Sequence, residues 1–288
     1  METINQLLVQ TENAFSGEEH QAFHWDGNNQ KAVLLVHGFP GTPAEMRPVA
    51  QIFYDLGWTV HGVLLPGFGA DIDHILERTH QDWLNAVSKA LAILKHDHEQ
   101  VILVGFSMGG AIALKLATEK ALDGLVLFSP FLEIDHLLWR ALPAIRLFLP
   151  KVKIFKLFKP DFSNPQTRDG IHNFMPNADL DDPDVQQEIL EFELPISMFN
   201  EIRTIGKQAA QVAAMLQIPV QVFQGLQDDL VKPERTRKLV ADLSTLVDYT
   251  EVNAPHEIIN PALDDWSIIV SRLRIFAETI AVKGEIYE

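Results

Sequence analysis

The 288-residue sequence contains no cysteine, which excludes a disulfide framework, a thiolate metal site and a cysteine nucleophile. It also lacks a run of about 18 apolar residues, the length that a membrane-spanning helix requires. Residues 1–11 have neither the basic flank nor the continuous apolar core of a signal peptide. We therefore expect a soluble intracellular protein and assign it to the cytoplasm.

Positive charge is scarce, because 23 lysines and arginines stand against 39 aspartates and glutamates, giving a formal net charge of −16 at pH 7. Such a chain repels polyanions, so nucleic-acid binding is not expected. Apolar residues make up 47% of the chain, which is enough for one large core or two modest ones.

Apolar runs of strand length alternate with stretches of helical periodicity. Strands are predicted at 31–36, 58–65, 101–105, 122–128, 219–224 and 247–252, and helices at 43–56, 80–95, 233–245 and 264–282. A further helix follows the strand that ends at Gly105. This alternation favours an α/β fold with a mostly parallel sheet, whose reactive residues gather at the carboxyl ends of the strands. An edge hairpin is predicted through 21–28.

The alternation breaks between residues 131 and 205, which are helix-like and interrupted by prolines. We interpret this stretch as an inserted helical cap. Residues 1–130 and 206–288 then form the core.

A nucleophile motif follows the central apolar run. Gly105-Phe106-Ser107-Met108-Gly109 has the Gly-x-Ser-x-Gly pattern and lies between a predicted buried strand and a predicted helix. In this pattern the serine occupies a strained strand-to-helix turn that exposes its hydroxyl, and the glycines relieve crowding on both sides. Ser107 is the predicted nucleophile.

A serine nucleophile needs a base, and the base needs an acid that orients it. Asp228 follows the strand predicted at 219–224, and His256 follows the strand predicted at 247–252. The chain order Ser107, Asp228, His256 matches that of α/β-hydrolase sheets. Asp229 competes for the acidic role, but spacing from Gly225 favours Asp228 and leaves Asp229 as a loop or helix-capping acid.

Backbone N–H groups are expected to stabilise the oxyanion, with Met108 supplying one and Phe39 the other. His37 precedes Phe39, and we assign it a structural role in shaping this loop. His96 and His98 suggest a metal site only faintly, because no third ligand is indicated near them.

Four motifs in order resemble the α/β-hydrolase superfamily, and within it the bacterial carboxylesterase, monoacylglycerol lipase and lysophospholipase group. They are the segments 37–47, 105–110, 225–231 and 255–257. The resemblance implies a Ser107–His256–Asp228 triad, oxyanion donors at Phe39 and Met108, a cap that controls the acyl pocket, and no cofactor or metal. Phe68 departs from the pattern, since many relatives have a histidine there.

The predicted cap has two charged stretches. Residues 140–159 contain basic and apolar side chains without an acid, whereas 179–193 are strongly acidic. The basic stretch is interpreted either as an amphipathic cover of the acyl pocket with solvated lysines, or as a surface that contacts lipid transiently. Met198 and Phe199 are expected to serve packing and could line an apolar pocket.

Together these features predict a serine hydrolase that cleaves acyl esters through an acyl-enzyme. Medium- or long-chain esters such as monoacylglycerols are the expected substrates. The alternatives are a serine acyltransferase or peptidase on the same triad, and a ligand-binding protein on a hydrolase scaffold.

Overall fold

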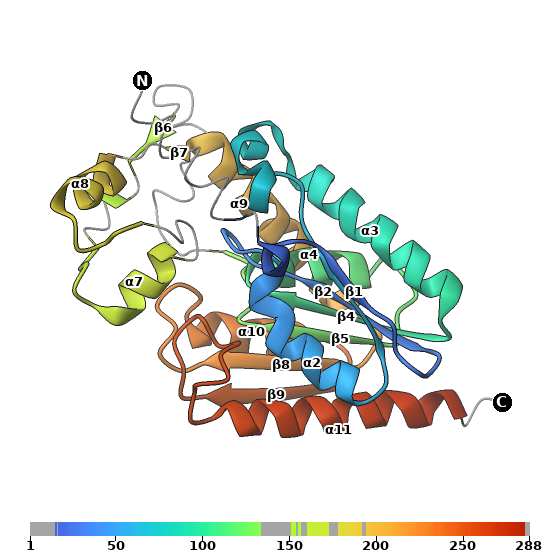
Figure 1. The fold of residues 1–288 in the computed structure, drawn as a ribbon. Helices are drawn as coiled ribbons and strands as arrows, with labels where there is room; N and C mark the ends of the chain where they lie inside the picture. The colour runs from blue at the N-terminus through green and yellow to red at the C-terminus, as the bar shows by residue number, and fades with distance from the viewer. Residues whose placement is uncertain are drawn as a thin grey trace.

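The computed structural model describes Phe15 and residues 17–133, 151–153, 155–156, 160–172, 178–191 and 194–285. Its centre is a seven-stranded sheet with the order β1-β3-β2-β4-β5-β8-β9 (Figure 1). The strands are β1 (Phe23–Trp25), β2 (Lys31–Val36), β3 (Thr59–Val63), β4 (Gln100–Phe106), β5 (Gly124–Phe128), β8 (Val220–Gly225) and β9 (Val247–Val252). All neighbouring strands are parallel except β1 and β3, which confirms the predicted α/β fold.

The central strands are continuous apolar runs in the sequence because helices cover both faces of the sheet. From Ala32 to Val36, β2 is fully buried, and so is the whole of β4. The predicted edge hairpin at 21–28 is wrong in its partner: β1 pairs with β3, through Phe23 and Gly62, rather than with the next strand along the chain. Both edges of β2 are already hydrogen-bonded, to β3 and β4, so only the free edge of β3 accepts β1.

Helices cover the two faces of the sheet (Figure 1). The main helices are α2 (Arg47–Asp55), α3 (His80–Asp97), α4 (Met108–Ala117), α9 (Ile196–Val212), α10 (Pro233–Asp242) and α11 (Trp266–Glu285). One buried cluster contains side chains of α3, α4, α9 and α10, and the other contains side chains of α2 and α11. A capping box between Thr79 and Asp82 fixes the start of α3.

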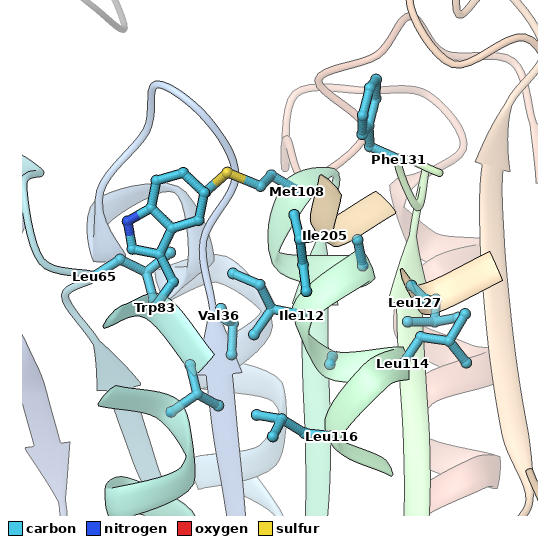
Figure 2. Packing of buried hydrophobic residues seen from close by; sticks show 14 of the residues in the cluster. Val36, Leu65, Trp83, Met108, Ile112, Leu114, Leu116, Leu127, Phe131 and Ile205 are labelled. Atoms are coloured by element: carbon cyan, nitrogen blue, oxygen red, sulfur yellow. The ribbon is translucent and has the colours of Figure 1, made fainter. Parts of the chain in front are cut away.

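The helix α4, which follows the predicted nucleophile Ser107, lies in the first cluster. Its side chains Met108, Ile112, Leu114 and Leu116 pack among residues that come from four other elements (Figure 2). Gly110 and the alanines of α4 are also buried, so every residue of the helix except Lys115 is enclosed. The position of Met108, the residue after Ser107, is therefore fixed by packing in the core.

Smaller elements fill the stretch between β5 and β8. These are β6 (Lys151–Val152), α7 (Pro165–His172), α8 (Pro183–Glu191) and β7 (Leu194–Pro195), with β6 and β7 forming a separate two-stranded sheet. Figure 1 shows α7 and α8 at one end of the molecule, on the opposite side from the C-terminal end of α11. The boundary predicted at 205/206 falls inside α9, which packs along α4.

Two 3-10 helices complete the loops around the carboxyl edge of the sheet. These are η2 (Pro43–Met46), which leads into α2, and η3 (Gly69–Glu77), which follows β3. Within the described part of the chain, none of the helices combines the length and apolarity needed to cross a bilayer.

Candidate active site

Ser107 occupies the turn between β4 and α4 with a left-handed φ of 51° and a ψ of −115°. Crowding explains the glycines on both sides of it. A Cβ on Gly105 would lie 2.3 Å from the Gly109 carbonyl oxygen, and a Cβ on Gly109 would lie 2.3 Å from that of Val36. No side chain fits at either position, so the sharp turn depends on glycine at both.

A continuous hydrogen-bonded chain links the three side chains predicted from the sequence. The distance from Ser107 Oγ to His256 Nε2 is 3.0 Å, and that from His256 Nδ1 to Asp228 Oδ2 is 2.7 Å. The Asp228 side chain is fully buried, and Ser107 is 4% exposed. This geometry allows His256 to accept the serine proton at Nε2 while Nδ1–H donates to Asp228.

Asp228 is held by a polar network of its own. Its Oδ1 accepts the backbone N–H groups of Leu230 and Val231, at 2.9 and 2.7 Å. Its Oδ2 also accepts from Gln224 Nε2 at 3.1 Å. Asp229, the competing acid, is exposed. The structure therefore brings Asp228, and not its neighbour, to His256.

Gln224 was missed by the sequence analysis. It is fully buried at the end of β8, and its Oε1 accepts from Thr236 Oγ1 of α10 at 2.5 Å. Gln224 thus ties the acid loop to a helix. The only signal in the sequence was a polar residue at a position where a buried strand ends.

The two N–H groups expected to face an oxyanion come from the predicted segments. Met108 is the first residue of α4, and Phe39 follows Gly38 after β2. Among the described residues, neither N–H has a hydrogen-bond partner, so both are available to a bound group. The N-terminus of α4 adds a favourable potential for negative charge beside Ser107.

His37 shapes the loop that carries Phe39. Its Nε2 accepts the Leu65 N–H at 3.1 Å, so the ring proton is on Nδ1, which lies 2.8 Å from the Gly38 carbonyl oxygen. Complete burial lowers the pKa of His37 to about 4. The ring is therefore neutral at physiological pH and remains a donor to Gly38.

Aromatic and apolar side chains surround this loop. Phe39 makes edge contacts with Phe68 and Phe199, with ring centroids 6.0 and 6.4 Å apart. Phe68, the departure from the family pattern, is fully buried and also packs edge-on against His37 at 5.0 Å. Met108 and Trp83 belong to the same buried cluster (Figure 2). Phe68 therefore contributes packing to the loop where a histidine would offer a polar contact.

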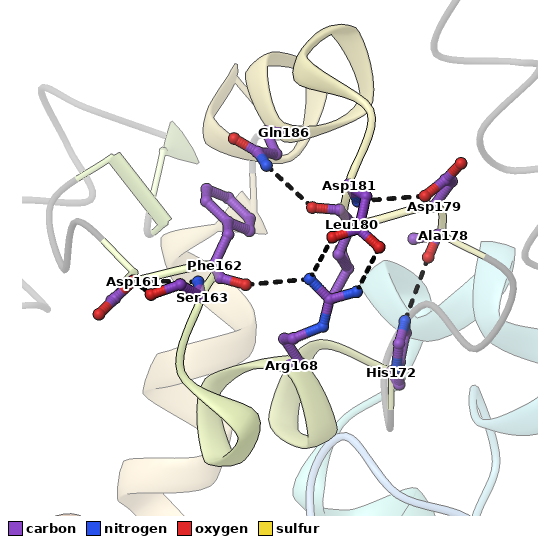
Figure 3. A network of polar contacts seen from close by, with 10 residues as sticks. All are labelled: Asp161, Phe162, Ser163, Arg168, His172, Ala178, Asp179, Leu180, Asp181 and Gln186. Atoms are coloured by element: carbon purple, nitrogen blue, oxygen red, sulfur yellow. Dashed lines mark hydrogen bonds and ion pairs between the residues drawn. The ribbon is translucent and has the colours of Figure 1, made fainter.

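Charged pairs hold the described part of the predicted cap. Arg168 donates to both carboxylate oxygens of Asp181 at 2.9 and 3.1 Å and to the Phe162 carbonyl oxygen at 3.1 Å (Figure 3). Glu191 accepts from Lys153 and Lys156 at 2.5 and 2.7 Å. These two lysines lower the pKa of Glu191 to about 2.

The positive charge of the basic stretch predicted at 140–159 is thus partly neutralised by Glu191, which lies 35 residues after Lys156 in the sequence. Its members Arg140, Arg146 and Lys159 lie outside the described residues. The transient lipid contact expected of this stretch stays a prediction.

His96 and His98 do not converge on a common point. His96 Nδ1 contacts Asp97 at 2.8 Å, whereas His98 Nδ1 contacts the Leu94 carbonyl oxygen at 3.0 Å. Across the described residues, no group of three or more histidine, aspartate or glutamate side chains is arranged to hold a metal ion.

The chain is similar to several known lipolytic enzymes. A thermostable monoacylglycerol lipase from Bacillus sp. (strain H-257) is 26% identical over 253 residues, which cover 87% of this chain and 92% of that protein. A solved chain from a study of LipS and LipT, two metagenome-derived lipolytic enzymes, has a TM-score of 0.72 at 20% identity and covers 91% of this chain and 98% of its own. The Paleococcus ferrophilus monoacylglycerol lipase has a TM-score of 0.64 at 18% identity, covering 88% and 97%.

The structural similarities, at these low identities, show a shared fold. The family is shown by the sequence itself, because residues 27–260 match the model of the family described as Serine aminopeptidase, S33. The chain therefore belongs to this serine hydrolase family within the α/β-hydrolase superfamily.

Proposed function

We propose that the protein hydrolyses carboxylic esters through an acyl-enzyme formed on Ser107. The observation that carries this proposal is the hydrogen-bonded chain from Ser107 Oγ through His256 to Asp228, at 3.0 and 2.7 Å. A lipase- or esterase-type hydrolase is also what the lipolytic relatives support. Ser107, His256 and Asp228 are the proposed triad, and Phe39 and Met108 the proposed oxyanion donors.

The reaction follows from these positions. His256 Nε2 takes the Ser107 proton as Oγ attacks the ester carbonyl carbon, and the Phe39 and Met108 N–H groups stabilise the oxyanion. The intermediate collapses by breaking the bond to the alcohol oxygen, which receives the proton from His256. Water then attacks the acyl carbon, gives a proton to His256, and releases the acid and Ser107. Asp228 stays ionised and stabilises the imidazolium.

The proposed substrates are medium- or long-chain acyl esters such as monoacylglycerols. Support comes from the apolar side chains near the oxyanion loop, Phe39, Phe199 and Met108, which suit an alkyl chain better than a polar one. The names of two relatives point the same way. We also propose that residues 131–205 act as a cap on this pocket, with 1–130 and 206–288 as the core.

Amide hydrolysis is the second candidate, favoured by the description of the matching family as a serine aminopeptidase. The same triad serves esters and amides, and acyl transfer would differ only in the acceptor. A ligand-binding protein on a hydrolase scaffold, without catalytic activity, is the third candidate.

The test is an ester series with acyl chains of two to sixteen carbons, including 1-monoacylglycerols, with aminoacyl amides assayed alongside. We expect activity to peak at medium or long chains. A peak at acetate or butyrate would contradict the proposed chain length, and turnover of amides alone would favour the aminopeptidase.

We expect Ser107→Ala to lower kcat at least about ten-thousand-fold, because the nucleophile is lost. Its thermal unfolding midpoint should stay near that of the wild type, since only one hydroxyl is removed. A fluorophosphonate should label the wild type and not the variant. A wild-type protein that the fluorophosphonate does not label would instead support a ligand-binding protein without catalytic activity.

A further inference from the structure

Gly38 is held from both sides of its backbone. Its carbonyl oxygen accepts from His37 Nδ1, and its N–H donates to the carboxylate of Glu45 in η2. The peptide group between Gly38 and Phe39 contains both that carbonyl and the Phe39 N–H, which is a proposed oxyanion donor. Because the peptide is planar, whatever fixes the Gly38 carbonyl also fixes the direction of the Phe39 N–H.

Position 38 has little room for a side chain. A Cβ there would lie 3.1 Å from the Phe106 ring, 3.3 Å from Ser107 Cβ and 3.4 Å from Glu45 Oε1. Glycine fits this space, but it is also the residue with the greatest backbone freedom. Polar contacts from neighbouring side chains therefore have to set its conformation.

The same distances place Glu45 close to the reacting groups. Ser107 Cβ and Glu45 Oε1 both lie within van der Waals range of one point beside Gly38. The Phe106 ring at that point is also packed on the His256 imidazole, with centroids 5.1 Å apart. Gly38, to which Glu45 is hydrogen-bonded, is thus close to both Ser107 and Phe106, and Phe106 contacts His256.

The charged groups that act on Glu45 come from the loop after β9. His256 lowers its pKa and Glu257 raises it, while burial has the largest effect and brings the pKa of Glu45 to about 7. The charged and titratable groups of the neighbouring loop have other partners: Arg47 donates to the backbone of Glu18 and Glu19, and His20 contacts Thr42. Glu45 therefore titrates in the working range of pH, whereas His37, with a pKa of about 4, does not.

We infer that Glu45 is a positioning residue that fixes the oxyanion loop through the Gly38 N–H and couples electrostatically to His256. This inference rests on the proposed function, because the loop matters only if Phe39 and His256 act in turnover. Glu45 lies within the motif segment 37–47 but was assigned no role from the sequence, and its contact with Gly38 joins positions seven residues apart.

Two variants of Glu45 distinguish the effect of its hydrogen bond with the Gly38 N–H from the effect of its negative charge. Glu45→Gln keeps an oxygen that accepts from Gly38 and loses the charge, whereas Glu45→Ala loses both. The matched control is Glu278→Gln, on the exposed side of α11. For each protein we would measure the NMR titration of the His256 ring, assigned with His256→Gln, and kcat and KM across pH.

We expect Glu45→Gln to lower the His256 titration midpoint by a few tenths of a pH unit, because Glu45, with a pKa of about 7, is partly ionised near neutral pH and that negative charge favours the imidazolium. The acidic limb of kcat/KM should move with it, and kcat at its plateau should stay within about threefold of the wild type. Glu45→Ala should lower kcat about tenfold or more, with KM changing less, because a charge-assisted hydrogen bond that aims the loop is lost.

An unchanged His256 titration in Glu45→Gln, together with wild-type kcat in Glu45→Ala, would overturn the inference. The NMR titration needs no turnover, so it separates this result from failure of the proposed function. A protein whose His256 titration shifts as expected, but whose wild type hydrolyses no ester, would support the charge coupling and contradict the esterase.

Discussion

The sheet with its flanking helices and the stretch between β5 and α9 are held together in different ways. Core residues such as those of β4 and α4 are buried in apolar surroundings on every side. The described elements between β5 and α9 bury fewer side chains, Ile171, Leu180 and Ile189 among them, and add exposed ion pairs, such as Arg168 with Asp181 and Glu191 with two lysines. Two of these acids, Asp181 and Glu191, have side chains that are 81% and 37% exposed.

The difference has a consequence for tolerance to substitution. A tightly packed interior responds strongly to a single added or removed atom. Exposed ion pairs contribute little each, because water and salt screen them. We therefore expect changes in the core to affect activity and stability much more than changes in the inserted stretch, and three variants test this.

The largest effect is expected for Asp228→Asn. An amide cannot stabilise the imidazolium, and it favours the wrong His256 tautomer, so kcat should fall by about 10⁴. Asp229→Asn is the neighbouring control and should stay within about twofold of the wild type, since Asp229 is exposed. Steady-state kinetics of both variants test the assignment, and equal losses would contradict it.

A smaller effect, on stability, is expected for Gly109→Ala. The added Cβ would lie 2.3 Å from the Val36 carbonyl oxygen and 2.4 Å from that of His37. Relieving this overlap requires backbone movement in the core, which should cost about 1–3 kcal/mol in the free energy of unfolding. Gly17→Ala is the control, because its Cβ would meet only the flexible Glu19 side chain. Urea unfolding that does not distinguish the two would contradict the prediction.

The smallest effect is expected for Arg168→Gln. The thermal midpoint of global unfolding should hardly change, but limited proteolysis between residues 160 and 191 should become faster, because Asp181 and the Phe162 carbonyl lose their partner. Arg272→Gln on α11 is the control.

The effect of Arg168→Gln should also depend on pH. The hydrogen bond from Arg168 lowers the pKa of Asp181, so the ion pair stabilises the fold fully above the ordinary aspartate pKa of about 3.9, and this stabilisation is lost as pH falls through the lowered pKa of Asp181. If Arg168→Gln lowered the thermal midpoint of global unfolding as much as Gly109→Ala does, the expected difference in tolerance between the core and the stretch from β5 to α9 would be contradicted.

The sequence predicted the core well because its signals are local. The strand predictions gave β2 and β9 at the observed residues and the other parallel strands to within two residues at either end. The spacing around Ser107 and the chain order of the acid and the histidine identified the side chains that meet at the turn. The spacing signals lie within a few residues of the positions they specify, whereas the chain order relates Ser107 to a histidine 149 residues away.

The remaining contacts could not be predicted because they join distant segments. Nothing near Gln224 indicates that Thr236 and Asp228 would surround its amide. The contact of His80 with Glu201, at 2.5 Å, joins α3 to α9 across 121 residues. The partner of β1 was likewise wrong, because pairing depends on which strand edges are left free.

The way the chain leaves the nucleophile turn has one more consequence. Phe131, the third residue beyond β5, donates its N–H to the Ser107 carbonyl oxygen at 3.0 Å. The Ser107 N–H in turn donates to the Phe128 carbonyl oxygen at 2.9 Å. The proposed cap thus starts from a point that is fixed relative to the Ser107 hydroxyl. A change of length or sequence in the proposed cap could therefore alter which molecules are recognised while the hydrogen-bonded chain of Ser107, His256 and Asp228 stays in place.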